Sequence, residues 1–80
     1  MAKSQYYMNT ISSRIKERRK SLDITQDELA SLAGIHKNTL CKIEQGKENP
    51  RLDVLYKICD ILGFEISLKV KSPNTEDSNA

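Results

Sequence analysis

The feature that most constrains this chain is the stretch TQDELASLAGIHKNTLCKIEQGK, which runs from Thr25 to Lys47. Thr25 is a favourable helix N-cap, and Glu28 three residues later is placed to hydrogen-bond back to the Thr25 backbone N–H, which makes a capping box. Gly34 predicts the end of this helix, because glycine adopts the left-handed conformation without steric cost. A second helix is predicted from about His36 to Gln45, before the next glycine.

The second helix carries two faces of different chemistry. At about 100° per residue, Leu40 and Ile43 share one face, which we expect to point to a core. The other face has no acidic residue and presents Asn38, Cys41, Lys42 and Gln45, with Lys37 at its flank. Amides pair bidentately with adenine and lysines with guanine. We therefore interpret the pair of helices as a helix-turn-helix whose second helix enters the DNA major groove; a solvated helix face is the alternative.

These motifs resemble the Cro/phage-repressor (xenobiotic-response-element, XRE) family of helix-turn-helix domains over about Ile11 to Leu62. The residues in register are Gln26, Glu28-Leu29-Ala30, Gly34, Thr39, Ile43-Glu44 and Gly46-Lys47. The preceding ISSRIKERRKSLDITQ is similar to the first helix of the lambdoid phage repressors. The resemblance implies a mainly α fold, a lambda-repressor-like bundle of four to five helices.

The resemblance also implies roles for individual side chains. The DNA sequence would be read by Lys37, Asn38, Cys41 and Lys42. Contacts to phosphates and the DNA backbone fall to Gln26, Thr39, Gln45 and Lys47, to which we add Arg14 from the basic run of the first helix. Arg19 is expected to pair with Glu44 and tie the first helix to the recognition helix.

The flanking helices are expected to complete the core. One is predicted from about Thr10 to Ser21 and the other from about Leu52 to Leu62. Arg18 falls on the apolar stripe of the first, so we expect its stem to pack and its guanidinium to turn outward. Asp23 stands where the resembled family often has a glycine that ends the first helix, and Asp tolerates the left-handed conformation better than most residues. The predicted core residues of these helices are Ile11, Ile15, Leu22, Leu52, Leu55, Ile58, Cys59 and Leu62.

His36 has two interpretations. It stands where the resembled family usually has Ser or Thr at the start of the second helix, and histidine is a poor N-cap. One interpretation is a tolerated weak cap. The other is a contact to a phosphate or base that strengthens at low pH.

Beyond Gly63 the periodicity changes from helix to strand. Phe64, Ile66, Leu68 and Val70 alternate with polar residues over 64–71, which predicts a half-buried strand. A lone strand needs a ladder partner, so we expect antiparallel pairing with the same strand of a second copy. An axis near Ser67 places Glu65 opposite Lys69, and an axis at Leu68 places Glu65 opposite Lys71. Both registers match opposite charges, and both stay open.

Composition and charge limit the function classes. The 80 residues allow one small domain, with a formal net charge of only +2. The bases gather in the first helix and the helix-turn-helix, as nucleic-acid binding requires. A single His and two Cys show no metal-ligand spacing, so no metal or cofactor is expected. The sequence contains no recognisable set of catalytic residues, which argues against an enzyme. The sequence shows no signal peptide and no apolar run of membrane length. We therefore expect a cytoplasmic bacterial protein that does not associate with a membrane.

The domain organisation follows as a flexible N-terminus over 1–9, a DNA-binding domain over 10–63, a dimerisation strand over 64–71 and a disordered tail over 72–80. The leading function is a transcriptional repressor that binds a palindromic operator in double-stranded DNA as a homodimer. LGFEISLKVK also resembles the end of HipB-type antitoxins, which bind a kinase-like toxin and repress their own operon. A third hypothesis is a protein-interaction module that does not bind DNA.

Overall fold

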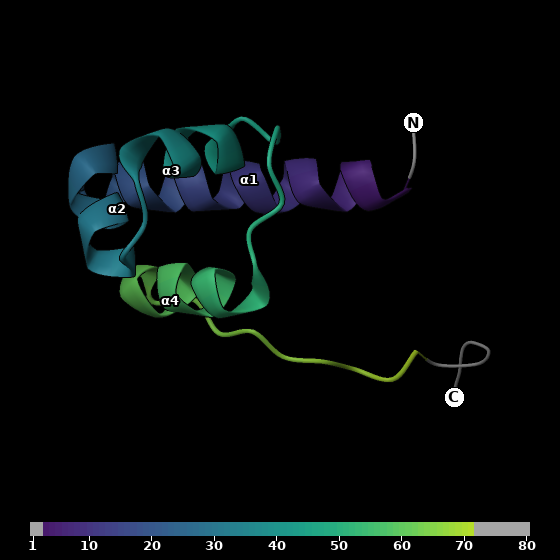
Figure 1. The fold of residues 1–80 in the computed structure, drawn as a ribbon. Helices are drawn as coiled ribbons and strands as arrows, with labels where there is room; N and C mark the ends of the chain where they lie inside the picture. The colour runs from purple at the N-terminus through teal and green to yellow at the C-terminus, as the bar shows by residue number, and fades with distance from the viewer. Residues whose placement is uncertain (1–2, 72–80) are drawn as a thin grey trace.

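The computed structural model describes residues 3–71, and this part of the chain contains four α-helices (Figure 1). They are α1 (Lys3–Ser21), α2 (Gln26–Ala33), α3 (Lys37–Glu44) and α4 (Leu52–Leu62). α1 and α2 each pack against both α3 and α4. The mainly α bundle predicted from the sequence is confirmed. Residues 64–71 form neither helix nor strand within this single chain, and the predicted tail 72–80 lies outside the described residues.

α1 begins earlier than the sequence indicated. The predicted start at Thr10 is wrong, because the helix already begins at Lys3, and its N-terminal part extends past the other helices (Figure 1). The segment 3–9 has no apolar stripe to mark it as helical, yet it also has no proline or glycine to stop a helix. Once a helix is nucleated, each further residue adds a hydrogen bond at little cost.

The core takes large apolar side chains from all four helices. The fully buried ones are Ile15, Leu29, Leu40, Ile43, Ile58 and Leu62. Two predicted core residues are not in it, since Leu22 is 39% exposed and Leu52 is 66% exposed. Leu22 follows the last residue of α1, so the helical wheel no longer places it. Leu52 opens α4, and a side chain there leans toward the helix N-terminus, beyond the packed turns.

Each helix is followed, one or two positions after its last residue, by one residue in the left-handed conformation. These residues are Asp23, Gly34, Gly46 and Gly63. At the end of α4, for example, Gly63 N donates to Asp60 O at 3.2 Å and Phe64 N donates to Cys59 O at 2.8 Å. This pair of bonds satisfies carbonyls that the helix leaves free and reverses the chain sharply. The left-handed conformations predicted at Gly34 and Asp23 are confirmed.

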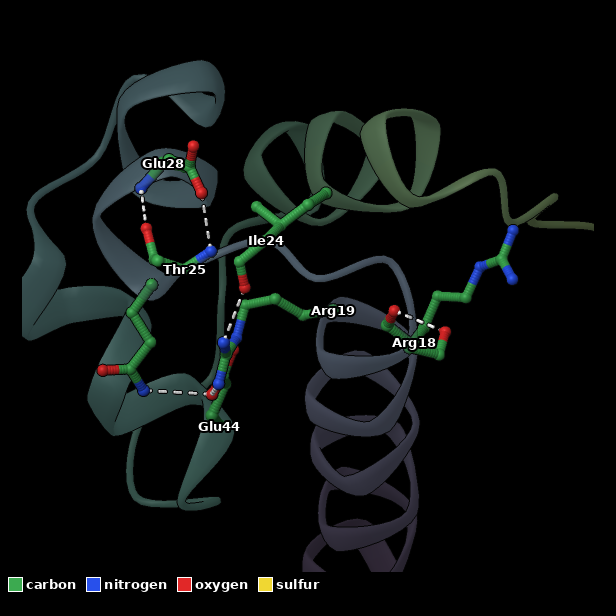
Figure 2. Close-up of polar contacts among 8 residues, drawn as sticks. Arg18, Arg19, Ile24, Thr25, Glu28 and Glu44 are labelled. Carbon is green, nitrogen blue, oxygen red and sulfur yellow. Dashed lines mark hydrogen bonds and ion pairs between the residues drawn. The ribbon is translucent and has the colours of Figure 1, made fainter.

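The N-terminus of α2 carries the predicted capping box (Figure 2). Thr25 Oγ1 accepts from Glu28 N at 3.1 Å, and Glu28 Oε1 accepts from Thr25 N at 2.8 Å. The hydrogen bond from the Thr25 backbone N–H, and secondly the bond with its side chain, favour the charged carboxylate. They hold the pKa of Glu28 below its usual 4.5.

This lowered pKa predicts a pH-dependent contribution of Glu28 to stability. Because the folded-state pKa lies below the usual value, the stabilisation is fully present above pH 4.5 and is lost as the pH falls through the folded-state pKa. Glu28→Gln should therefore lower the melting temperature at pH 7, and the gap to the unaltered protein should close at pH 3. Glu17→Gln on the exposed surface of α1 controls for loss of charge. A gap that is equal at both pH values would contradict the prediction.

Candidate nucleic-acid interface

α3 divides into the two faces that the sequence predicts. Leu40, Ile43 and Glu44 are buried. The four residues assigned to base contacts lie together on the other side, where Lys37, Asn38 and Lys42 are exposed and Cys41 is partly exposed. Of the residues assigned to the DNA backbone, Gln45 and Lys47 are exposed and Thr39 is partly buried. The eight residues of α3 thus place mainly polar side chains outward, and two large apolar side chains together with Glu44 inward.

The end of α3 is fixed to α1 by two buried polar contacts. Ser12 Oγ donates to Ile43 O at 2.6 Å, which satisfies a carbonyl in the last turn of α3. The second contact is the Arg19–Glu44 ion pair that the resemblance implied, with Arg19 8% and Glu44 7% exposed. The sequence reading missed Ser12. Its only signal is a small polar residue beside the apolar stripe of α1.

Arg19 uses all three of its guanidinium nitrogens (Figure 2). Nε and Nη2 donate to the two carboxylate oxygens of Glu44 at 2.7 and 3.1 Å, and Nη1 donates to Ile24 O at 2.8 Å. A bidentate, charge-assisted pair of this kind has a defined geometry as well as a strong attraction. It therefore fixes α1, the loop before α2 and α3 relative to one another.

Gln26 is part of the same cluster. Its Nε2 donates to Glu44 Oε1 at 3.0 Å. Because an ionised carboxylate only accepts hydrogen bonds, Glu44 requires the amide nitrogen of Gln26 to face inward. The sequence reading placed Gln26 on a phosphate and did not foresee this bond. One amide N–H of Gln26 is not used by Glu44, so the two roles are compatible.

An acidic residue from α2 reaches the rim of the interface. Asp27 Oδ2 lies 3.7 Å from Lys37 Nζ, and both side chains are largely exposed. The helical wheel of α3 has no acid on its outward face, so only the neighbouring helix brings one there. Elsewhere on the rim, Gln45 Nε2 donates to Cys41 Sγ at 3.4 Å.

Two arginines of α1 lie on its other side, toward the end of α4. The Arg14 guanidinium lies over the Phe64 ring, 5.4 Å from its centroid, so the structure does not group Arg14 with α3. Arg18 Nε donates to Leu62 O at 2.8 Å, and Figure 2 shows its side chain extending toward that helix end. Arg18 is exposed, as predicted, and its guanidinium in addition reaches the end of α4, because a carbonyl left free in the last turn attracts a cation.

His36 is the N-cap of α3, and its side chain makes no capping hydrogen bond. This fits the weak-cap reading, and a DNA contact by His36 stays a prediction. Cys59 is buried, and burial raises the pKa of its thiol. Among residues 3–71, no three potential ligands lie close enough to hold a metal ion. No helix in that range is long and apolar enough to cross a membrane.

Comparisons with known proteins agree with this geometry. The family model described as Helix-turn-helix matches residues 15–69. An uncharacterized HTH-type transcriptional regulator of Archaeoglobus fulgidus is 41% identical over 54 residues, which are 68% of this chain and 76% of that protein. The transcriptional repressor RstR of the cryptic phage CTXphi, from Vibrio cholerae, is 33% identical over 64 residues, 80% of this chain and 58% of RstR. The immunity repressor of Bacillus phage phi105 is 36% identical over 58 residues, 72% of this chain and 40% of that repressor.

The buried ion pair predicts a large effect of removing one partner. Arg19→Met leaves the Glu44 carboxylate buried without its cation, which should lower the free energy of unfolding by about 3–5 kcal/mol. The double change Arg19→Met with Glu44→Leu removes both charges and should recover most of that loss. Chemical denaturation measures both, with Lys20→Met on the exposed side of α1 as control. A single variant as stable as the control would show that the pair contributes little.

Proposed function

The chain belongs to the helix-turn-helix family of DNA-binding transcription regulators, and from this premise we propose that it is a sequence-specific repressor. The observation that carries the proposal is the division of α3 into a buried apolar face and an outward polar face, held in place by Arg19 and Glu44. A recognition helix must be rigid to read base edges, since hydrogen-bond geometry depends on position. Repression then follows from occupying an operator on intracellular DNA.

We assign the outward residues to two tasks. Base edges are read by Lys37, Asn38, Cys41 and Lys42, because these side chains lie on the exposed or partly exposed surface of α3. Gln26, Thr39, Gln45 and Lys47 contact phosphates and set the register of the protein on the duplex. The hydrogen bond from Gln26 to Glu44 supports the assignment of Gln26 to a phosphate, because it positions the side-chain amide before the protein binds DNA.

We further propose that the protein binds a palindromic operator as a homodimer. In the single chain, Leu68 is 95% and Val70 is 99% exposed, and the segment that carries them extends away from the end of α4 (Figure 1). Pairing residues 64–71 with the same segment of a second copy gives both backbones hydrogen-bond partners and covers these side chains. Two-fold symmetry then presents two recognition helices to successive major grooves, about 34 Å apart.

A second candidate is a HipB-like antitoxin that also binds a kinase-like toxin. The observation in its favour is the same exposed, extended segment, since such a segment adds readily to the sheet edge of another protein. A kinase-like reading frame next to the gene favours this candidate. Co-purification of the two products with the operator then tests it.

The assignment of α3 predicts a difference between base and phosphate contacts. Each bidentate base contact contributes about 1–3 kcal/mol of discrimination, so Asn38→Ala and Lys42→Ala should flatten the preference among operator variants. Gln26→Ala should weaken binding to all sequences alike. Mobility-shift titrations against the promoter of its own gene and its base variants measure both, with circular dichroism to check folding. An unchanged preference in both α3 variants would place recognition elsewhere.

The dimer proposal predicts that the end of the chain controls mass in solution. The full chain should be a dimer at low micromolar concentration, and a chain ending at residue 63 should be a monomer with the helices intact. Light scattering gives the mass, and circular dichroism the helix content. A truncated chain that still dimerises would move the interface to the helices.

A further inference from the structure

The C-terminal segment leaves the bundle with one face already directed toward it. Phe64 N donates to Cys59 O at 2.8 Å, which fixes the direction in which the chain leaves α4. Phe64 and Ile66 are partly buried, whereas Glu65 and Ser67 between and after them are exposed. This period-two alternation follows an extended backbone, in which successive side chains point to opposite sides. The face of Phe64 is therefore the face that meets the helices.

A shallow hollow lies beside Phe64, between α1 and the end of α4. It has a volume of about 290 Å³ and is lined mainly by apolar atoms, among them those of Ile11, Cys59 and Phe64. Glu65 is also among its lining residues. Within the chain, the next apolar residues of the same face, Leu68 and Val70, extend beyond the hollow and contact almost nothing.

The two antiparallel registers that suit the charges differ in what they place beside this hollow. With the axis at Ser67, Phe64 lies opposite the partner's Val70, and Ile66 lies opposite the partner's Leu68. With the axis at Leu68, Phe64 lies opposite the polar residue Ser72 of the second copy, and Leu68 meets its own counterpart. Directly opposite residues of an antiparallel pair lie on the same face of the sheet. Only the first register brings an apolar side chain of the second copy to Phe64.

We propose that the two-fold axis passes through Ser67 and that the partner's Val70 covers the hollow between α1 and α4, an inference that rests on the proposed dimer. Each copy then completes the apolar surface of the other. The four apolar side chains of each half-ribbon lie on the side of the helices, and Glu65 lies opposite the partner's Lys69, an opposite charge. The hollow and the exposed side chains are thus complementary parts of one interface.

Single cysteines report the axis directly, because only the residue on the axis lies opposite itself. In the full chain with Cys41→Ser, where Cys59 is buried, Ser67→Cys and Leu68→Cys are compared under mild oxidation. Opposite Cβ atoms are about 5 Å apart, close enough for a disulfide after a small adjustment. We expect a covalent dimer from Ser67→Cys and none from Leu68→Cys. The reverse result overturns the register, and so does a non-covalent dimer with neither cross-link, whereas a monomeric full chain refutes the dimer itself.

The role of Val70 is tested separately. Since this side chain is 99% exposed in the single chain, Val70→Ala should not change the stability of the helices. It removes apolar surface from both halves of the dimer, which should weaken dimerisation by about a hundredfold. Lys71→Ala, the neighbouring residue on the polar face, is the matched control. Equal dimerisation constants for the two variants, measured by analytical ultracentrifugation, would show that Val70 does not cover the hollow.

Discussion

The structure depends most on the buried contact between Arg19 and Glu44. A carboxylate with both oxygens engaged by one guanidinium has a fixed orientation, and here the same guanidinium also holds the backbone oxygen of Ile24. The end of α1, the loop that follows it and the end of α3 meet at these atoms (Figure 2). Since two charges inside a protein are costly to separate, the pair resists any shift of α3 relative to α1. The outward surface of α3 is therefore presented by a rigid support.

Short, well-defined helix ends make that arrangement possible in a small chain. Every helix is followed by one left-handed residue and a pair of backbone hydrogen bonds, so the chain reverses within a few residues. α4 is attached to α1 as well, because Arg18 of α1 donates a hydrogen bond to the carbonyl of Leu62, the last residue of α4. The start of the C-terminal segment is consequently held by α1, the same helix that supports α3.

The basic run of α1 serves two sides of the molecule. Arg19 points to α3, whereas Arg14 and Arg18 point to Phe64 and the end of α4. At 100° per residue, neighbouring or alternate positions on a helix face different neighbours. A cluster of basic residues in the sequence thus indicates a basic domain, but it does not show which of these residues face DNA. The structure reduces the number of cations from α1 that are available to the interface.

The sequence alone determined the local features: the capping box at Thr25, the left-handed conformations at Asp23 and Gly34, the bounds of α4 and the two faces of α3. These follow from residues a few positions apart, whose chemistry acts whatever the remainder of the chain does. It missed the start of α1, the exposure of Leu22 and Leu52, the role of Ser12 and the partners of Gln26 and Arg18. Only tertiary structure decided these, because each depends on which carbonyl, carboxylate or apolar surface of a distant helix lies within reach.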